Sequence, residues 1–139
     1  MYLTPLQRKN LGIEVVEPKA RKPQNHFEDT QQENCYTWFL YQWKQYKDNF
    51  CAVPNGGKRD KKEAARLKKQ GVLAGWPDTQ LMVARKGYHG LFLEGKWENN
   101  DRSDNQKRVG AALEREGYLV VVFRSKEEFM DAVNDYLNE

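Results

Sequence analysis

The sequence predicts an α/β domain in which helices are layered on a sheet. Segments with apolar side chains at three- and four-residue spacing alternate with short, continuous apolar runs. The first pattern is typical of helices that face a core, and the second is typical of buried strands. Turn residues such as Pro54 and Gly117 separate the segments. The resulting order, α-β-(α)-β-β-α-β-α, favours an α/β architecture.

The length predicts one domain. The chain has 139 residues, which suffices for one compact domain and is too short for two ordinary ones. Residues 1–25 contain three prolines and scattered basic residues, and we predict that they form an extended N-terminal arm. Residues 26–139 would then form the single folded domain.

The first half of this domain is predicted to contain two helices and one strand. Residues 26–47 form a helix, residues 50–53 a short strand that ends at Pro54, and residues 59–70 a basic helix that stops at Gly71. The apolar stripe of the first helix lies at i, i+3, i+4 and i+7, in Tyr36, Phe39, Leu40 and Trp43.

The second half begins with two strands, residues 79–84 and 90–96, joined by a turn at residues 85–88. A helix then starts at Ser103 and stops at Gly117. Its inward residues are predicted to be Val109, Ala112 and Leu113.

An apolar strand and a helix complete the domain. Residues 118–123 are apolar throughout, which is typical of a strand covered on both faces. Ser125 and Glu128 have the spacing of a capping box and start the last helix. The inward residues of that helix are predicted to be Phe129, Val133, Tyr136 and Leu137.

The composition excludes several classes of protein. Hydrophobic residues make up 39% of the chain and charged residues 31%, and no run approaches the roughly 20 apolar residues of a membrane span. The N-terminus lacks the apolar segment of a signal peptide, so we expect a cytoplasmic protein without a membrane partner. Cys35 and Cys51 have no second Cys or His at ligand spacing, and we expect two reduced, buried thiols.

The net charge of +3 is unevenly distributed. Residues 58–69 carry seven basic residues against two acidic ones, a local charge of +5, which leaves the rest of the chain at −2. A basic face of this kind suggests a docked polyanion, and the alternative is an ordinary solvated helix face. The basic residues are Lys58, Arg59, Lys61, Lys62, Arg66, Lys68 and Lys69.

The predicted hairpin brings two carboxylates together. If its turn is centred near Lys86, Asp78 lies opposite Glu94, with Cβ atoms roughly 5 Å apart. Side chains alternate along a strand, so Lys96 points to the same face as Glu94, whereas Gly95 points to the other. Asp78, Glu94 and Lys96 therefore converge at one end of the sheet.

Two opposed carboxylates repel each other, and a bound divalent cation removes that repulsion. Carboxylate oxygens are preferred ligands of Mg²⁺ and Mn²⁺, and the carbonyl of Gly95 could be a further ligand. Lys96 beside the metal could hold or deprotonate a water, or stabilise developing negative charge. This equipment suits metal-assisted hydrolysis of a phosphodiester. The alternative is a surface ion-pair cluster in which Lys96 neutralises both acids.

Three more polar residues could support this site. Glu28 and Gln32 are four residues apart and share a helix face with the core stripe. Glu28 also has the spacing of a capping box with Asn25, and Gln106 has that spacing with Ser103. A residue in the first turn of a helix can serve as cap and as site residue together.

These residues resemble a known family. Gly75-Trp76-Pro77-Asp78, Glu94-Gly95-Lys96, the Glu28…Gln32 pair and Arg102-Ser103-x-x-Gln106 look like the VRR-NUC domain (virus-type replication-repair nuclease) of the PD-(D/E)XK superfamily. Residues 53–78 also resemble the stand-alone phage members. The resemblance runs from about Glu28 to Leu137.

The resemblance implies a restriction-endonuclease-like α/β core, with a mixed central sheet flanked by helices, and a divalent metal, Mg²⁺ or Mn²⁺. By the family pattern, Asp78 and Glu94 would be metal ligands and Lys96 the catalytic lysine. Glu28 and Gln106 would support the site, and Gln32 more loosely. A phage protein of this type would act in the bacterial cytoplasm.

The expected activity is therefore metal-dependent endonuclease cleavage of branched DNA, in the manner of a Holliday-junction resolvase. Branched or duplex DNA would contact the basic residues 58–69, and no sequence-reading motif is present. The resemblance to the stand-alone phage members, which are homodimers, implies a homodimer, and the many aromatic residues of helix 26–47 suggest an interface. The alternative is a catalytically silent or partner-dependent DNA-binding accessory protein on the same fold.

Overall fold

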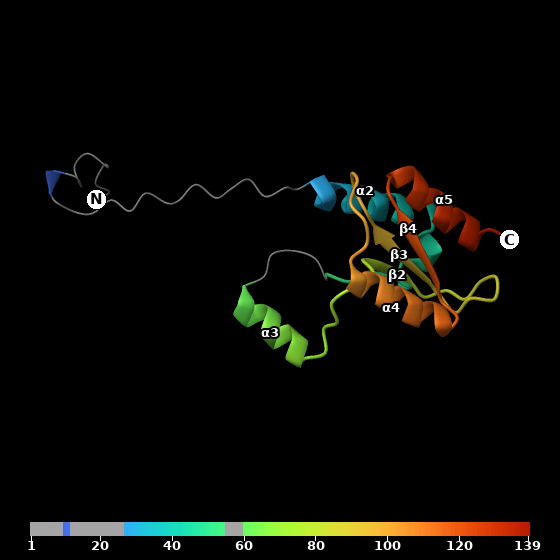
Figure 1. The fold of residues 1–139 in the computed structure, drawn as a ribbon. Coiled ribbons are helices and arrows are strands. Elements are labelled where there is room, and N and C mark those ends of the chain that lie inside the picture. Colours follow the sequence, from blue (N-terminus) through green and yellow to red (C-terminus); the bar gives the residue numbers. More distant parts are fainter. Residues whose placement is uncertain (1–9, 12–26, 55–59) are drawn as a thin grey trace.

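A four-stranded mixed sheet forms the centre of the molecule (Figure 1). The computed structural model describes residues 10–11, 27–54 and 60–139, so almost all of the predicted N-terminal arm lies outside the described residues. The strands are β1 (Phe50–Ala52), β2 (Thr79–Leu81), β3 (Leu91–Gly95) and β4 (Leu119–Phe123), and they lie side by side in that order. β1, β2 and β3 pair antiparallel, whereas β4 pairs parallel to β3. The predicted order of elements is confirmed.

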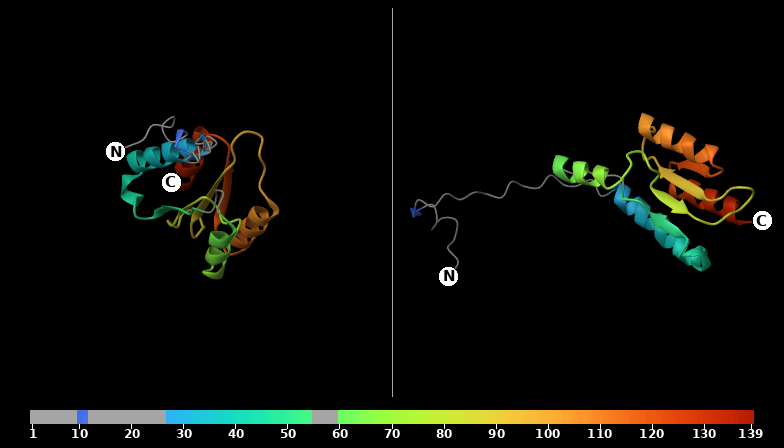
Figure 2. Two further views of the ribbon diagram at one scale, coloured as in Figure 1. Left: turned by 90° about the vertical axis from the view of Figure 1, so that its left-hand side faces the viewer. Right: turned by 90° about the horizontal axis from the view of Figure 1, so that it is seen from below.

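Helices cover both faces of this sheet (Figure 2). α2 (Phe27–Gln42) and α5 (Lys126–Leu137) lie on one face, and α4 (Asp104–Arg115) lies on the other. β3 contributes side chains to the cores on both faces of the sheet, because successive side chains of a strand point to opposite faces. Leu91 and Leu93 belong to the larger core under α2 and α5. Phe92 belongs to the smaller core under α4, and Glu94 has the same parity and so points to that side.

The predicted first helix ends earlier than expected, at Gln42, and a short 3₁₀ helix, η1 (Lys44–Tyr46), follows. Most of the aromatic rings between Tyr36 and Tyr46 pack in the core. Phe39 is fully buried and stacks on Phe50, with ring centroids 4.4 Å apart. Tyr41 is 87% exposed, and Tyr36 is 44% exposed although it stacks on Phe50 at 5.9 Å. The surplus of aromatic side chains that suggested a dimer interface is therefore small.

The β2–β3 hairpin has the predicted register, since Thr79 pairs with Leu93 and Leu81 with Leu91. Both strands are shorter than predicted, although single backbone bonds to the neighbouring chain segments continue beyond them. The N–H of Met82 donates to the Asn49 carbonyl, and the N–H of His89 donates to the Gly117 carbonyl. The turn itself is Lys86-Gly87, both with positive φ.

Two predictions for the second half need correction. β4 is contacted by α4 and α5, but it is an edge strand, so its residues from Leu119 to Val122 are only half-buried. On α4, Val109 and Leu113 are buried as predicted, but Ala112 is exposed and Gly110 takes the inward position. The face of α4 that packs on the sheet therefore consists of Val109, Gly110 and Leu113.

The predictions for the last helix and the cysteines are confirmed in part. The four predicted inward residues of α5 are buried, and Ser125 caps the helix by accepting the Glu128 N–H. The Glu128 carboxylate, however, accepts the N–H of Arg124, so the capping box is incomplete. Both cysteines are free thiols, but only Cys35 is buried. Cys51 is exposed because it lies on the outer face of edge strand β1.

The basic segment forms helix α3 (Lys61–Lys69), which Asp60 caps by accepting the Glu63 N–H at 2.7 Å. α3 buries none of its residues and projects beyond the end of the sheet where β2 begins (Figures 1 and 2). Within the described residues, none of the helices has the length and apolar character that crossing a bilayer requires.

Candidate active site

The candidate site lies at the end of the sheet where β2 begins and β3 ends. Asp78 immediately precedes β2, and Glu94 is the fourth residue of β3. The register of the hairpin continues to place Asp78 opposite Glu94. The parallel pairing of β4 and the loop after β3 bring the first turn of α4 to the same end. The start of β2, the end of β3 and the first turn of α4 thus supply one site.

Hydrogen bonds hold the two carboxylates against each other. The Gly95 backbone N–H donates to Asp78 Oδ2 at 2.8 Å. The backbone of Asp78 also acts on the Glu94 carboxylate and lowers its pKa. The side chain of Gln106 adds a second hydrogen bond, from Nε2 to Glu94 Oε1 at 2.6 Å. The carboxylates are therefore fixed in position by the backbone of the hairpin and by α4.

The pKa values of the two carboxyl groups indicate that ionising both of them is unfavourable in the folded protein. Glu94 is only 2% exposed. Burial, followed by the charge of Asp78, raises the pKa of Glu94 from 4.5 to about 7, although the nearby Lys96 ammonium lowers it. Burial likewise raises the pKa of Asp78, against the opposing effects of the Gly95 N–H and Lys96. Lys96 therefore lies close to both acids and compensates only part of their charge.

Gln106 serves both as a helix cap and as a site residue. Its Oε1 accepts the Ser103 N–H at 2.9 Å, and Ser103 Oγ accepts the Gln106 N–H at 3.2 Å, which completes the predicted capping box. Because Oε1 is used by the cap, the amide nitrogen is left to donate to Glu94. The capping box thus fixes the orientation of the amide that positions the carboxylate.

Arg102 is a neighbour of the site to which the sequence analysis assigned no role. Its positive charge lowers the pKa of Glu94. Its guanidinium lies over the surface of α4, where a Cβ at Gly110 would come within 3.2 Å of Nη1. Its place in the Arg102-Ser103-x-x-Gln106 pattern could have indicated a role at the site. The sequence does not show that Gly110 leaves room for its side chain.

The two predicted residues of α2 are placed differently. Glu28, in the first turn of α2, lies close enough for its charge to raise the pKa of Asp78. A contact between Phe27 and Trp97, with ring centroids 6.3 Å apart, fixes this end of α2 beside the strand end. Gln32 lies one turn further on, is exposed, and has no hydrogen bond to Asp78 or Glu94 among the described residues. Asn25, the alternative cap partner of Glu28, lies outside them.

The structure explains why glycine occupies the middle position of Glu94-Gly95-Lys96. A Cβ at Gly95 would lie 3.0 Å from Phe123 Cζ and 3.4 Å from Asp78 Oδ2. A side chain here would press on the Phe123 ring and would also contact the Asp78 carboxylate. Glycine thus leaves room for Asp78 to approach the strand closely enough to accept the Gly95 N–H.

A solved structure matches this fold and sequence. A "VRR_NUC domain protein" is 31% identical to the chain with a TM-score of 0.68, and the match covers 79% of this chain and 87% of the other. The chain belongs to the VRR-NUC domain family. The predicted family and restriction-endonuclease-like core are therefore confirmed. No family model matches the chain, and no curated protein matches it.

The donor set of this VRR-NUC domain fits a hard divalent cation. In the part of the chain that the structure describes, there is no cluster of three or more Asp, Glu, His or Cys side chains that could hold a metal. Asp78 and Glu94 are a pair, and Mg²⁺ is commonly bound by one or two carboxylates, with water and substrate phosphate completing its shell. Burial raises the pKa of both acids, and the Asp78 charge raises that of Glu94 further, so a bound cation would stabilise their ionised forms.

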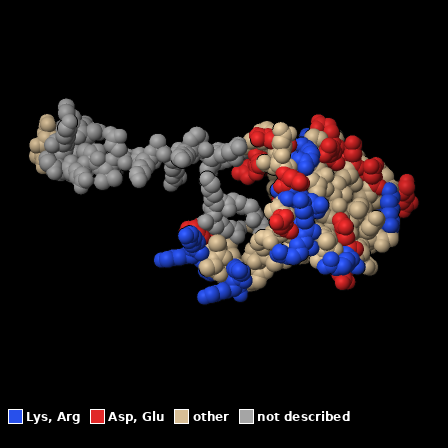
Figure 3. Space-filling view, viewed as in Figure 1, with Lys and Arg blue, Asp and Glu red and all other residues tan. Residues whose placement is uncertain are grey.

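The basic surface of the VRR-NUC domain borders the same end of the sheet. Five of the seven predicted basic residues lie on α3, and all five are exposed: Lys61, Lys62, Arg66, Lys68 and Lys69. Lys58 and Arg59 lie outside the described residues. Figure 3 shows these cationic side chains extending from α3, whereas acidic side chains gather over the far end of the domain.

The loop that carries Asp78 is held against α4 by Gly75, which gives a testable prediction. Gly75 has φ +92°, and a Cβ there would lie 2.6 Å from the backbone of Asn105. Gly71 has a similar φ of +95°, but a Cβ there would meet nothing within 4 Å. We expect Gly75→Ala to lower the free energy of unfolding by about 2 kcal/mol more than Gly71→Ala, because overpacking adds to backbone strain.

Urea denaturation of both variants measures this difference. Gly71→Ala is the matched control for the strain of positive φ alone. Equal destabilisation by the two substitutions would show that the loop does not press on α4.

Proposed function

We propose that this VRR-NUC domain is a metal-dependent endonuclease that hydrolyses phosphodiesters in branched DNA. The observation that carries the proposal is the Asp78–Glu94 pair, in which Glu94 is buried and Asp78 half-buried. The Gly95 N–H fixes Asp78, the Gln106 amide fixes Glu94, and Lys96 compensates only part of the charge. A purely structural ion-pair cluster would leave less uncompensated charge. The exposed cations of α3 support a polyanionic substrate.

Each residue has a chemical role in this proposal. Asp78, Glu94 and the Gly95 carbonyl would hold Mg²⁺ or Mn²⁺, which supplies Lewis-acid activation of the phosphoryl oxygen and of water. Lys96, whose charge acts on both carboxylates, holds or deprotonates the attacking water or stabilises negative charge on the phosphate. Gln106 orients Glu94, and Glu28 adds negative charge near Asp78. We assign no role to Gln32 beyond the resemblance.

The preference for branched DNA and the homodimer rest on the family resemblance. A two-fold dimer would supply two sites for two matched cuts at a four-way junction. Among the described residues of α2, Tyr41 is the most exposed large hydrophobic side chain and a candidate for such an interface.

The direct test compares wild type with Lys96→Ala on a labelled four-way junction and a linear duplex of the same sequence, with Mg²⁺, Mn²⁺ or EDTA. We expect metal-dependent cuts near the branch in wild type and none with EDTA or in the variant. Equal cutting of both DNAs would support the nuclease activity but contradict the proposed preference for junctions. Tight binding without cutting in any metal would favour the DNA-binding accessory protein instead.

A further inference from the structure

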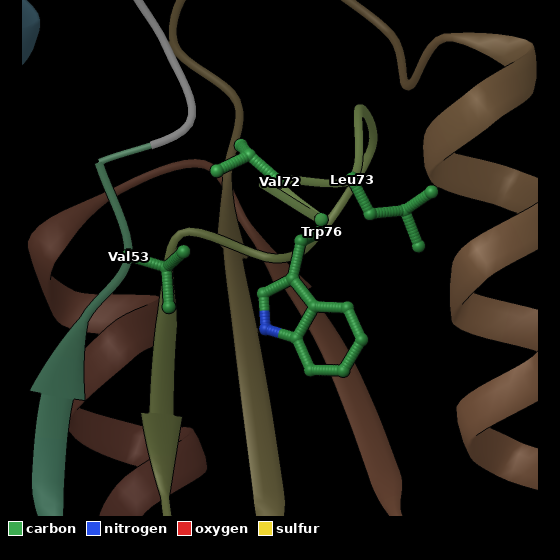
Figure 4. Close-up of a pocket in the computed structure, with 5 residues that line it drawn as sticks. Val53, Val72, Leu73 and Trp76 are labelled. Carbon is green, nitrogen blue, oxygen red and sulfur yellow. The ribbon is translucent and has the colours of Figure 1, made fainter. Parts of the chain in front are cut away.

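An apolar groove lies between the end of β1 and the segment that leads to Asp78, and the chemistry proposed above does not use it (Figure 4). Its volume is about 380 Å³, within the range of about 300–1,000 Å³ that is usual for ligand sites. Val53 contributes from the end of β1, and the other lining residues come from the segment between α3 and Asp78. The lining consists of Val53, Gly71, Val72, Leu73 and Trp76.

The groove and the carboxylate site form one unit. The Val53 backbone N–H donates to the Asp78 carbonyl oxygen at 2.7 Å, and Trp76 precedes Asp78 by two residues. The Trp76 indole is itself fixed, because Nε1–H donates to Gln80 Oε1 at 3.3 Å and the ring meets Phe92 edge-on at 5.5 Å. A group seated in the groove would therefore lie in a defined position relative to Asp78.

The rim of the groove joins it to the basic helix. Val72 and Leu73 are 38% and 49% exposed, and the Val72 N–H donates to the Leu67 carbonyl at the end of α3. The last turn of α3 carries Arg66, Lys68 and Lys69. The apolar surface is thus linked to the basic helix through Val72 and to the backbone of Asp78 through Val53.

We propose that the groove receives one unstacked nucleobase next to the phosphate that is cut. This inference rests on the proposed endonuclease function and specifies its substrate. A nucleotide carries an apolar ring and an anionic phosphate, which is the pairing that the groove and α3 complement. Aromatic and apolar side chains accept any base by its face, so the contact needs no particular sequence.

A base site of this kind explains a preference for branched DNA in physical terms. A base within a continuous duplex must first lose its pairing and stacking, whereas a base at a branch point, flap or gap has already lost part of both. The substrate class is therefore DNA with an unpaired or weakly stacked nucleotide beside the scissile phosphate.

The test moves a single abasic nucleotide through the positions on either side of the mapped cut in a branched substrate. We expect one position at which the abasic site slows cutting by wild type about tenfold. Leu73→Ser should slow cutting of intact DNA by a similar factor, with no further loss on the abasic DNA. Met82→Ser, at a side chain that is 38% exposed in the β2–β3 connection, is the matched control and should keep the wild-type pattern.

Several results would overturn the proposal. If wild type cuts every abasic substrate within twofold of intact DNA, the groove holds no base, although the endonuclease stands. If Met82→Ser shows the same effects as Leu73→Ser, the loss is not specific to the groove. If Leu73→Ser changes only the sedimentation mass, the groove is an interface between copies of this chain.

If wild type cuts no DNA at all, the endonuclease proposal fails. The base site is then tested by DNA binding instead of cleavage. 2-Aminopurine at the same positions, with metal-free protein, should change its fluorescence at one position in wild type and not in Leu73→Ser. An unchanged signal at every position would overturn the base site as well.

Discussion

Replacing Asp78 by Asn is expected to slow DNA cleavage by at least about a thousandfold while leaving the fold intact. The amide has the size of the carboxylate and keeps an oxygen that can accept the Gly95 N–H at 2.8 Å. It loses the negative charge that a divalent cation requires, and a lost ligand removes several kcal/mol of transition-state stabilisation. Single-turnover cleavage of a branched substrate in Mg²⁺ measures the rate, and circular dichroism checks the fold.

Asp101→Asn is the matched control, since it removes the same charge from the loop after β3. The side chain of Asp101 is 73% exposed, pairs with Lys107 at 3.8 Å, and has no hydrogen bond to Asp78 or Glu94 among the described residues. It should cut at nearly the wild-type rate. Cleavage by Asp78→Asn within tenfold of wild type would contradict a ligand role for Asp78.

Much of this site was predictable because it depends on local periodicity. The two-residue period of a strand and the position of the Lys86-Gly87 turn fix which residues face each other in a hairpin. Asp78 opposite Glu94 follows from them, and the structure has that register. The capping spacing of Ser103 and Gln106 is also local, and both hydrogen bonds of the box are present.

The remaining features depend on how distant elements pack, which spacing does not encode. That the amide of Gln106 reaches Glu94 follows from the placement of α4 on β3. The exposure of Cys51 follows from the edge position of β1. The amphipathic pattern of α3 shows which face is apolar, but it does not show that α3 would bury no residue.

The metal-free protein is expected to lose stability as pH rises from 5 to 8. Burial and the Asp78 charge raise the pKa of Glu94 from 4.5 to about 7 in the folded state. Between these values the folded protein binds more protons than the unfolded chain, so its free energy of unfolding falls with rising pH. The contribution is complete below pH 4.5 and is lost as pH passes 7, about 3 kcal/mol in all. The raised pKa of Asp78 acts in the same direction.

Urea unfolding in EDTA at pH 5, 6, 7 and 8 measures this loss, and Glu94→Gln is the control. The amide cannot ionise, so the variant should keep most of its stability at pH 8 and exceed wild type there, even though it should not cut DNA. A wild-type stability that is constant or rises over this range would show that the folded protein carries both charges without cost.

Adding a divalent cation distinguishes the two explanations for the acidic pair, a metal site and an ion-pair cluster completed by Lys96. Only the ionised carboxylates bind Mg²⁺, so Mg²⁺ should restore wild-type stability at pH 8 and have little effect at pH 5, where Glu94 is protonated. Glu94→Gln should show a much smaller response at either pH. An ion-pair cluster completed by Lys96 would be indifferent to Mg²⁺ at both. The pH dependence of the metal effect therefore tests whether the buried charge is retained for binding a cation, independently of whether a cleavable DNA has been found.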